Sequence, residues 1–128
     1  MATFDDVARI ALELPETSEG TSRGSRRWQV KDKLFVWERP LRRSDREALG
    51  AAAPQGPILG VRVEHLGAKE ALLESEPGFC FTTPHFDGHP SVLVQLDLIG
   101  PEDLEELIVE AWLARAPKRL ADAFVQER

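Results

Sequence analysis

The chain has 128 residues, 42% of them hydrophobic and 30% charged, with a formal net charge of −6 at pH 7, as expected for one water-soluble globular domain over residues 1–128. No apolar run approaches the roughly 20 residues that a membrane helix needs, and the acidic N-terminus lacks the basic and apolar parts of a signal peptide. Cys80 is the only cysteine, which excludes an internal disulfide framework and favours a cytoplasmic location.

The first predicted element is an N-terminal helix. Thr3 can cap it and Asp6 follows three residues later, while apolar residues repeat at helical spacing at Phe4, Val7, Ala8, Ala11 and Leu14. Pro15 ends the helix. The polar, glycine-containing stretch from Glu16 to Ser25 predicts a loop.

A tight hairpin comes next, with strands at Trp28–Lys31 and Leu34–Glu38 joined at Asp32-Lys33. The turn lacks the glycine that two-residue turns prefer, so its register stays open. Trp28, Phe35 and Trp37 are expected in or beside the core. If some of them project outward beside the basic residues of the hairpin, they can also stack on nucleic-acid bases.

The remaining chain alternates between strands and helices. After a long Pro- and Gly-containing excursion over residues 39–57, the expected elements are a helical turn at Ser44–Leu49, strands at Ile58–Val63, Phe79–Thr82 and Val92–Leu96, and helices at Gly67–Ser75, from Gly100-Pro101 and from Pro117. Leu120 and Phe124 are expected to face inward from the last helix. Strands joined by hairpins and flanked by helices predict an α+β domain, an antiparallel sheet packed by N-terminal and C-terminal helices.

Charge is unevenly distributed along the chain. Between Arg23 and Arg46 there are nine basic and three acidic residues, a net +6, whereas the rest carries seven basic and nineteen acidic residues, a net −12. A local positive field attracts polyanions, including DNA, whatever the net charge. The candidate nucleic-acid-binding residues are Arg26, Arg27, Lys31, Lys33, Arg42 and Arg43. The alternative is a solvated hairpin whose charges serve solubility.

A turn-rich segment, Thr83 to Pro90, holds a second candidate site. His85, Asp87 and His89 are spaced i, i+2, i+4, and two imidazoles with a carboxylate form a possible zinc or iron site. With Cys80 or Trp37 nearby, the same three residues are candidates for binding a small ligand. The alternative is a structural turn, because Asp-Gly and the flanking prolines are typical of turns.

Signatures of catalysis are sparse. Cys80 and His85 would form a thiolate–imidazole pair only at short distance, and Cys80, between two phenylalanines, is more typical of a buried thiol. Phosphate-loop, dinucleotide-fold, Cys-x-x-Cys and His-Glu-x-x-His motifs are missing, so no catalytic residue, metal or cofactor is predicted. The acidic face of Glu102 to Glu110 offers another possibility, docking of a protein partner, although solvation explains it equally well.

Nearly the whole chain, from about Phe4 to Phe124, resembles the MmcQ/YjbR family. The likeness lies in an N-terminal helix ending in Leu-Pro, Trp28-x-Val30, the run Lys33 to Arg42, the block Pro77 to Pro90 with Thr-Pro-His-Phe-Asp-Gly, and Ala111-Trp112 followed by Ala116-Pro117. The resemblance implies a CyaY-like α+β fold and DNA binding through a "double-wing" motif, with wings at Trp28–Glu38 and Phe79–Leu96. The second wing has no Lys or Arg, so contact through the basic hairpin and loop of residues 23–46 is expected of a non-catalytic binding protein.

Overall fold

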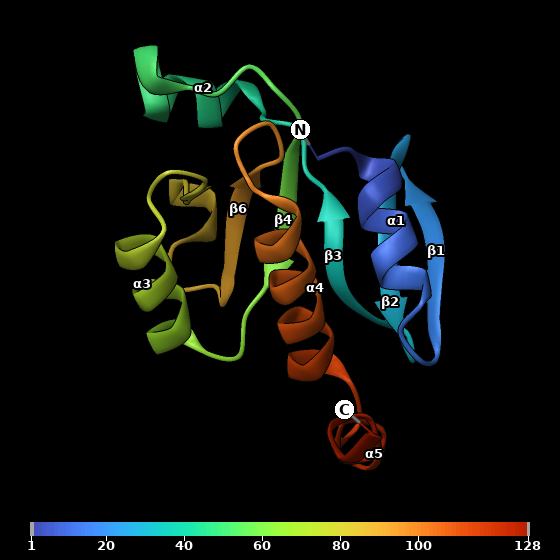
Figure 1. Cartoon of the computed structure of the whole chain (residues 1–128). Helices are drawn as coiled ribbons and strands as arrows, with labels where there is room; N and C mark the ends of the chain where they lie inside the picture. Colours follow the sequence, from blue (N-terminus) through green and yellow to red (C-terminus); the bar gives the residue numbers. More distant parts are fainter. Residues whose placement is uncertain (1, 128) are drawn as a thin grey trace.

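Within residues 2–127, which the computed structural model describes, six strands form one antiparallel sheet (Figure 1). Their order is β1-β2-β3-β4-β6-β5, with bounds Thr17–Ser22 (β1), Ser25–Val30 (β2), Lys33–Glu38 (β3), Ile58–Arg62 (β4), Cys80–Phe81 (β5) and Ser91–Gln95 (β6). The helices are Phe4–Leu12 (α1), Arg43–Leu49 (α2), Leu66–Ser75 (α3), Pro101–Arg115 (α4) and Lys118–Glu127 (α5), with short 3₁₀ turns at Gly50–Ala52 and Pro84–Phe86. The α+β class predicted from the sequence is confirmed.

Helix α1 begins where its capping residues predict. The Asp6 N–H donates to Thr3 Oγ1 at 3.2 Å, and the Thr3 N–H donates to Asp6 Oδ2 at 2.9 Å, which satisfies both ends of a capping box. The helix ends at Leu12, slightly before Leu14, the last residue of the expected apolar pattern. Together with α4 it covers one face of the sheet (Figure 1).

The prediction of a loop from Glu16 to Ser25 is wrong, because Thr17–Ser22 is the edge strand β1. It pairs with β2 from Thr17 opposite Val30 to Ser22 opposite Ser25, and the two-residue turn between them places Arg23 and Gly24 at φ 53° and 82°. A polar edge strand has no alternating apolar pattern, so only its pairing partner defines it.

The second turn is displaced by one residue from the expected Asp32-Lys33. Lys31 and Asp32 occupy it, with φ of 48° and 68°, and Lys33 is the first residue of β3. Two left-handed residues match the twist of the flanking strands, and Asp tolerates that conformation without glycine. The pairing of β2 with β3 also shifts its register between Trp28 and Gln29.

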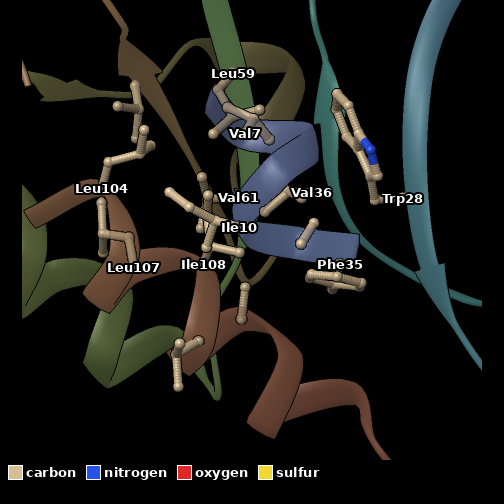
Figure 2. Close-up of a cluster of buried hydrophobic side chains, with 14 of the residues drawn as sticks. Val7, Ile10, Trp28, Phe35, Val36, Leu59, Val61, Leu104, Leu107 and Ile108 are labelled. Carbon is tan, nitrogen blue, oxygen red and sulfur yellow. The ribbon is translucent and has the colours of Figure 1, made fainter. Parts of the chain in front are cut away.

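The main core fills the space between the sheet and helices α1 and α4 (Figure 2). Trp28, Phe35 and Trp112 are fully buried, which confirms the core role predicted for the first two. Trp112 Nε1 donates to the Pro15 carbonyl at 3.0 Å and Trp28 Nε1 to Glu19 Oε1 at 2.9 Å, so both indoles are buried with their polar atom satisfied. Leu120 and Phe124 of α5 pack on this core, as predicted.

None of the helices in residues 2–127 combines the length and apolar character needed to cross a lipid bilayer. The opposite face of the sheet is left free by α1 and α4. Two connections, residues 39–57 and residues 82–90, fold over part of that face and form the walls of the site described next.

Candidate anion-binding cleft

The open face of the sheet carries a row of adjacent residues from β2 to β6. Arg27 pairs with Trp37, Trp37 with Gly60, and Gly60 with Leu93, so the four share one face. The Trp37 indole lies directly over Gly60, since a Cβ atom there would fall 2.3 Å from Trp37 Cε2. A half-buried indole therefore forms part of the floor, and it needs glycine beneath it.

A small second core forms the wall beside Trp37. Ile58, Phe86 and Leu93 are buried in it, and Leu41 and Phe81 pack against them. The Phe86 ring lies 6.4 Å from the Trp37 indole, centroid to centroid. This cluster fixes the histidine-containing segment against the sheet, because Phe86 is its anchor.

A buried ion pair ties the excursion of residues 39–57 to the same wall. Arg39 Nη2 lies 3.0 Å from Asp45 Oδ2, both side chains are almost fully buried, and the Arg39 guanidinium sits 5.3 Å from the Phe86 ring centroid. Burial opposes ionisation of Asp45, but the Arg42 N–H, donating at 2.8 Å, and the Arg39 charge hold the pKa of Asp45 below its ordinary value. The carboxylate thus stays charged and holds α2 on the wall.

Lys69 of α3 holds the histidine-containing segment from the other side. Its buried Nζ donates to the carbonyl of Phe86 at 2.6 Å and to that of His89 at 2.9 Å. Burial lowers the pKa of Lys69, an effect that the nearby Asp87 charge opposes. A helix-face lysine gives no sign in sequence of this inward role, so sequence reasoning missed it.

These elements enclose a cleft of about 830 Å³ on the open face. Its lining is rich in cationic and aromatic side chains, and seven arginines contribute: Arg23, Arg26, Arg27, Arg39, Arg42, Arg62 and Arg115, beside Trp37, His85, Phe86 and His89. Among the described lining residues Glu38 is the one carboxylate, and its Oε1 accepts the Arg26 N–H at 3.0 Å. We call this surface the arginine cleft.

Two of the seven arginines are already neutralised. Arg26 contacts Glu19 at 3.1 Å and Asp5 at 2.9 Å, on the side facing α1, and Arg39 is paired with Asp45. In the described part of the chain the other five, Arg23, Arg27, Arg42, Arg62 and Arg115, form no ion pair. The cleft therefore holds about five positive charges without counterions.

Burial and neighbouring positive charges lower the pKa of two groups in the cleft. Burial and the Arg115 charge lower the pKa of Arg62. Burial, then the charges of Arg62, Lys69, His85 and Arg115, lower the pKa of His89. An anion bound among these groups would relieve the repulsion.

The hydrogen-bond donors of the cleft also favour an anionic ligand. Arg27 Nε is buried without an acceptor, whereas Arg115 Nε donates to the Leu34 carbonyl at 3.2 Å, which orients its guanidinium. His89 Nδ1 lies 2.9 Å from Ser91 Oγ. The arrangement offers oriented donors to phosphate or carboxylate oxygens.

The structure divides the basic residues that the sequence grouped together. Arg27 and Arg42 line the cleft with Trp37, His85 and His89, whereas Arg26 is engaged with acidic partners. Lys31 and Lys33 lie at the hairpin tip outside the cleft, and Lys31 is 3.9 Å from Glu16. Arg43 is 94% exposed on α2, paired with Glu47 at 3.2 Å.

Two arginines of the cleft lie outside the basic segment of residues 23–46, and sequence reasoning missed them. Arg62 ends β4 and Arg115 ends α4, far in sequence from the basic segment. Long-range register brings them in, because Arg62 pairs with Ser91 beside His89. No local signal could have identified them.

The other predicted sites are not assembled. Among residues 2–127, no group of three or more His, Cys, Asp or Glu side chains is placed to hold a metal ion, and Asp87 is exposed outside the cleft. His85, Asp87 and His89 thus form a turn in which the two histidines border the cleft. Burial raises the pKa of the Cys80 thiol to about 12, so Cys80 is a protonated core residue and no thiolate–imidazole pair with His85 forms.

Comparison with known proteins gives a family and a fold. The YjbR family model matches residues 12–114. Uncharacterised proteins of Mycobacterium bovis and Mycobacterium tuberculosis are each 58% identical to the chain over 128 residues, covering 98% of this chain and 97% of theirs. A crystal structure of a Deinococcus radiodurans protein with a DUF419 domain superposes with a TM-score of 0.67 at 21% identity, covering 99% of this chain and 88% of that one. The structural likeness concerns the fold alone.

Proposed function

This chain belongs to the YjbR family, and on that premise we propose that it is a non-catalytic protein that binds nucleic acid through the arginine cleft. The observation that carries the proposal is the convergence of five unpaired arginines on one concavity floored by a half-buried tryptophan. Guanidinium groups bind phosphate oxygens in a fork, and an indole provides a surface for stacking a base.

The shape of the cleft favours a single strand over a duplex. At about 830 Å³ it lies within the roughly 300–1,000 Å³ range of ligand pockets. A base reaches the Trp37 indole only when it is unstacked, which a single strand allows at little cost. The strand's phosphates would then lie along Arg27, Arg42, Arg62 and Arg115.

The proposal refines the contact expected from the basic hairpin. The β2–β3 hairpin contributes Arg27 and Trp37, while the connection before β6 contributes His85 and His89 in place of Lys or Arg. The bound nucleic-acid strand would therefore lie between the β2–β3 hairpin and the β5–β6 pair, with more positive charge on the β2–β3 side.

Fluorescence anisotropy of a labelled single-stranded oligonucleotide tests this proposal with two matched double variants. Arg27→Gln/Arg42→Gln removes two charges from the cleft, and Lys33→Gln/Arg43→Gln removes two from the same segment outside it. Loss of two phosphate contacts should lower the slope of log affinity against log salt by about 1.4 and weaken binding by about tenfold or more. The control double should bind like the wild type. Equal loss in both variants, or no binding at about 50 mM salt, would contradict the proposal.

The size of the cleft also favours a second candidate, a nucleotide-sized phosphorylated ligand. The enclosing walls at Phe86 and Leu41 suit a compact molecule as well as a strand. A mononucleotide that competes as strongly as an oligonucleotide would favour this candidate, whereas affinity that grows with oligonucleotide length favours the strand.

A further inference from the structure

A second hollow lies on the helix-covered side of the sheet and is lined by residues of α3 and α4. It has a volume of about 700 Å³, and α3 and α4 flank it while making few contacts with each other. Its floor is apolar, formed chiefly by Val63, Leu72, Phe79 and Leu107. We call it the acid-rimmed groove.

The wall that α3 contributes is built from small side chains. Ala68, Ala71 and Ser75 line the groove at spacings of three and four residues, and Ala114 lines it from α4. Residues at this spacing share one face of a helix. Small residues there would allow the backbone of a docked helix to approach α3 closely, toward the usual separation of about 8–10 Å between axes.

The rim gives the groove its charge. Five carboxylates line it, namely Glu64, Glu76, Asp103, Glu106 and Glu110, against Arg62 as the one cation of the described lining. Among residues 2–127 none of the five takes part in an ion pair. Nucleic acid and anionic membranes would be repelled here, while a cationic partner would be attracted.

The spacing on α4 defines the partner further. Asp103, Glu106 and Glu110 are three and four residues apart and so follow one edge of the helix. The lined stretch of α4, from Asp103 to Ala114, is about 16 Å long at 1.5 Å per residue, or about three helical turns. A helix lying alongside would present cations to this rim at matching intervals.

From these features we propose that the acid-rimmed groove binds an amphipathic helix of a partner protein, with an apolar stripe on the groove floor and lysines or arginines along its flanks. The inference is independent of the nucleic-acid function proposed for the arginine cleft. It gives the protein two surfaces of opposite charge, one for an anion and one for a basic helix.

A synthetic helical peptide of about 14 residues, or four turns, tests the proposal with the full chain. The probe carries leucine and alanine on one face and lysines on both flanks. Two matched peptides replace the lysines by glutamates, or scramble the faces at constant composition. We expect the basic amphipathic peptide to bind and the other two to bind at least about tenfold more weakly, a difference measured by fluorescence anisotropy.

Paired charge reversals locate the binding surface. Glu106→Lys/Glu110→Lys should weaken binding of the basic peptide at least about tenfold and confer binding of the glutamate peptide. Glu74→Lys/Glu105→Lys makes the same charge change on α3 and α4 outside the groove and should leave binding unchanged. Ala71→Trp, at an exposed position, should block the groove without disturbing the fold.

Three results would overturn the proposal. They are equal loss of binding in the two charge-reversed variants, no binding of any helical peptide to the wild type, and self-association of the chain that the groove variants abolish. The last result would assign the groove to a second copy of this chain.

Discussion

The arginine cleft and the acid-rimmed groove are hollows of similar size with opposite charge. Within residues 2–127, the cleft, about 830 Å³, holds five arginines without an ion pair, and the groove, about 700 Å³, holds five carboxylates without one. Arg62 borders both. The net charge of −6 therefore averages two opposed surfaces and says little about the partner of either one.

The two regions also differ in how they are held. Loops form the walls of the cleft, and a buried ion pair, a buried lysine and an aromatic cluster hold those loops in place. Two regular helices form the groove walls. Structural changes in the loops should therefore affect the cleft and spare the groove.

The largest expected effect comes from breaking the buried pair. Asp45→Ala leaves Arg39 buried without its partner, so the free energy of unfolding should fall by about 3–5 kcal/mol. Glu47→Ala removes an exposed pair from the same helix and should cost about 0.5 kcal/mol or less. Urea denaturation measures both. Equal losses would contradict the account of the cleft wall.

Neutralising charge in each region tests whether the two surfaces act independently. The cleft double variant, Arg27→Gln/Arg42→Gln, should lose about tenfold or more in affinity for a single strand and keep its affinity for the basic peptide. Glu106→Gln/Glu110→Gln should lose affinity for the basic peptide and keep its affinity for a single strand. Anisotropy with both probes on both variants measures this. A variant that weakened both ligands would show that the surfaces are not independent.

The tryptophan on the cleft floor should contribute a smaller effect. Trp37→Leu keeps an apolar side chain over Gly60 but removes the stacking surface, so single-strand affinity should fall by about tenfold, equivalent to about 1.4 kcal/mol. Competition titration with unlabelled oligonucleotide measures the loss. Unchanged affinity would mean that the ligand contacts arginines without a stacked base.

The smallest expected effect is a pH dependence carried by His89. Its pKa is lowered by burial and by Arg62, Lys69, His85 and Arg115, so in the free protein it takes a proton only below the ordinary value of 6.5. Bound phosphate would raise that pKa, so affinity should rise about two- to fivefold between about pH 7.5 and pH 5.5. His89→Asn should reduce the rise, and an undiminished rise would contradict the role of His89.

The free energy of unfolding of the free protein should fall over the same decrease in pH that raises its affinity. Because the unfolded chain takes up the proton of His89 more readily than the folded one, this residue's contribution is fully present above pH 6.5 and is lost as pH falls toward its folded-state pKa. Urea denaturation of wild type and His89→Asn at the same two pH values separates this effect from binding.

Local patterns predicted most of the fold. The Thr3–Asp6 cap, the apolar spacing before Trp112 and the proline at residue 117 marked α1, α4 and the start of α5. Strand β1 and the turn at Lys31-Asp32 were misplaced, since a polar edge strand and a glycine-free turn are defined by pairing rather than by composition.

The site was predictable only in part, for the same reason. Arg27, Arg42, Trp37, His85 and His89 were selected from sequence and do line the cleft. The structure does not bring Lys31, Lys33 and Arg43 together with them, because the two lysines lie at the hairpin tip and Arg43 lies on α2, outside the cleft. Arg62, Arg115 and Lys69 reach the site through register and helix packing, which one sequence does not reveal.

The most direct measurement of the central claim follows the three indole N–H signals of the protein in a ¹H–¹⁵N correlation spectrum while a single-stranded oligonucleotide is added. Trp28 and Trp112 are buried and hydrogen-bonded, so they are internal controls, whereas Trp37 is half-buried in the cleft. The account predicts that the Trp37 signal shifts with saturation and that the other two stay in place. A saturable change centred on the hairpin tip at Lys31 and Lys33, with the Trp37 signal unmoved, would contradict it.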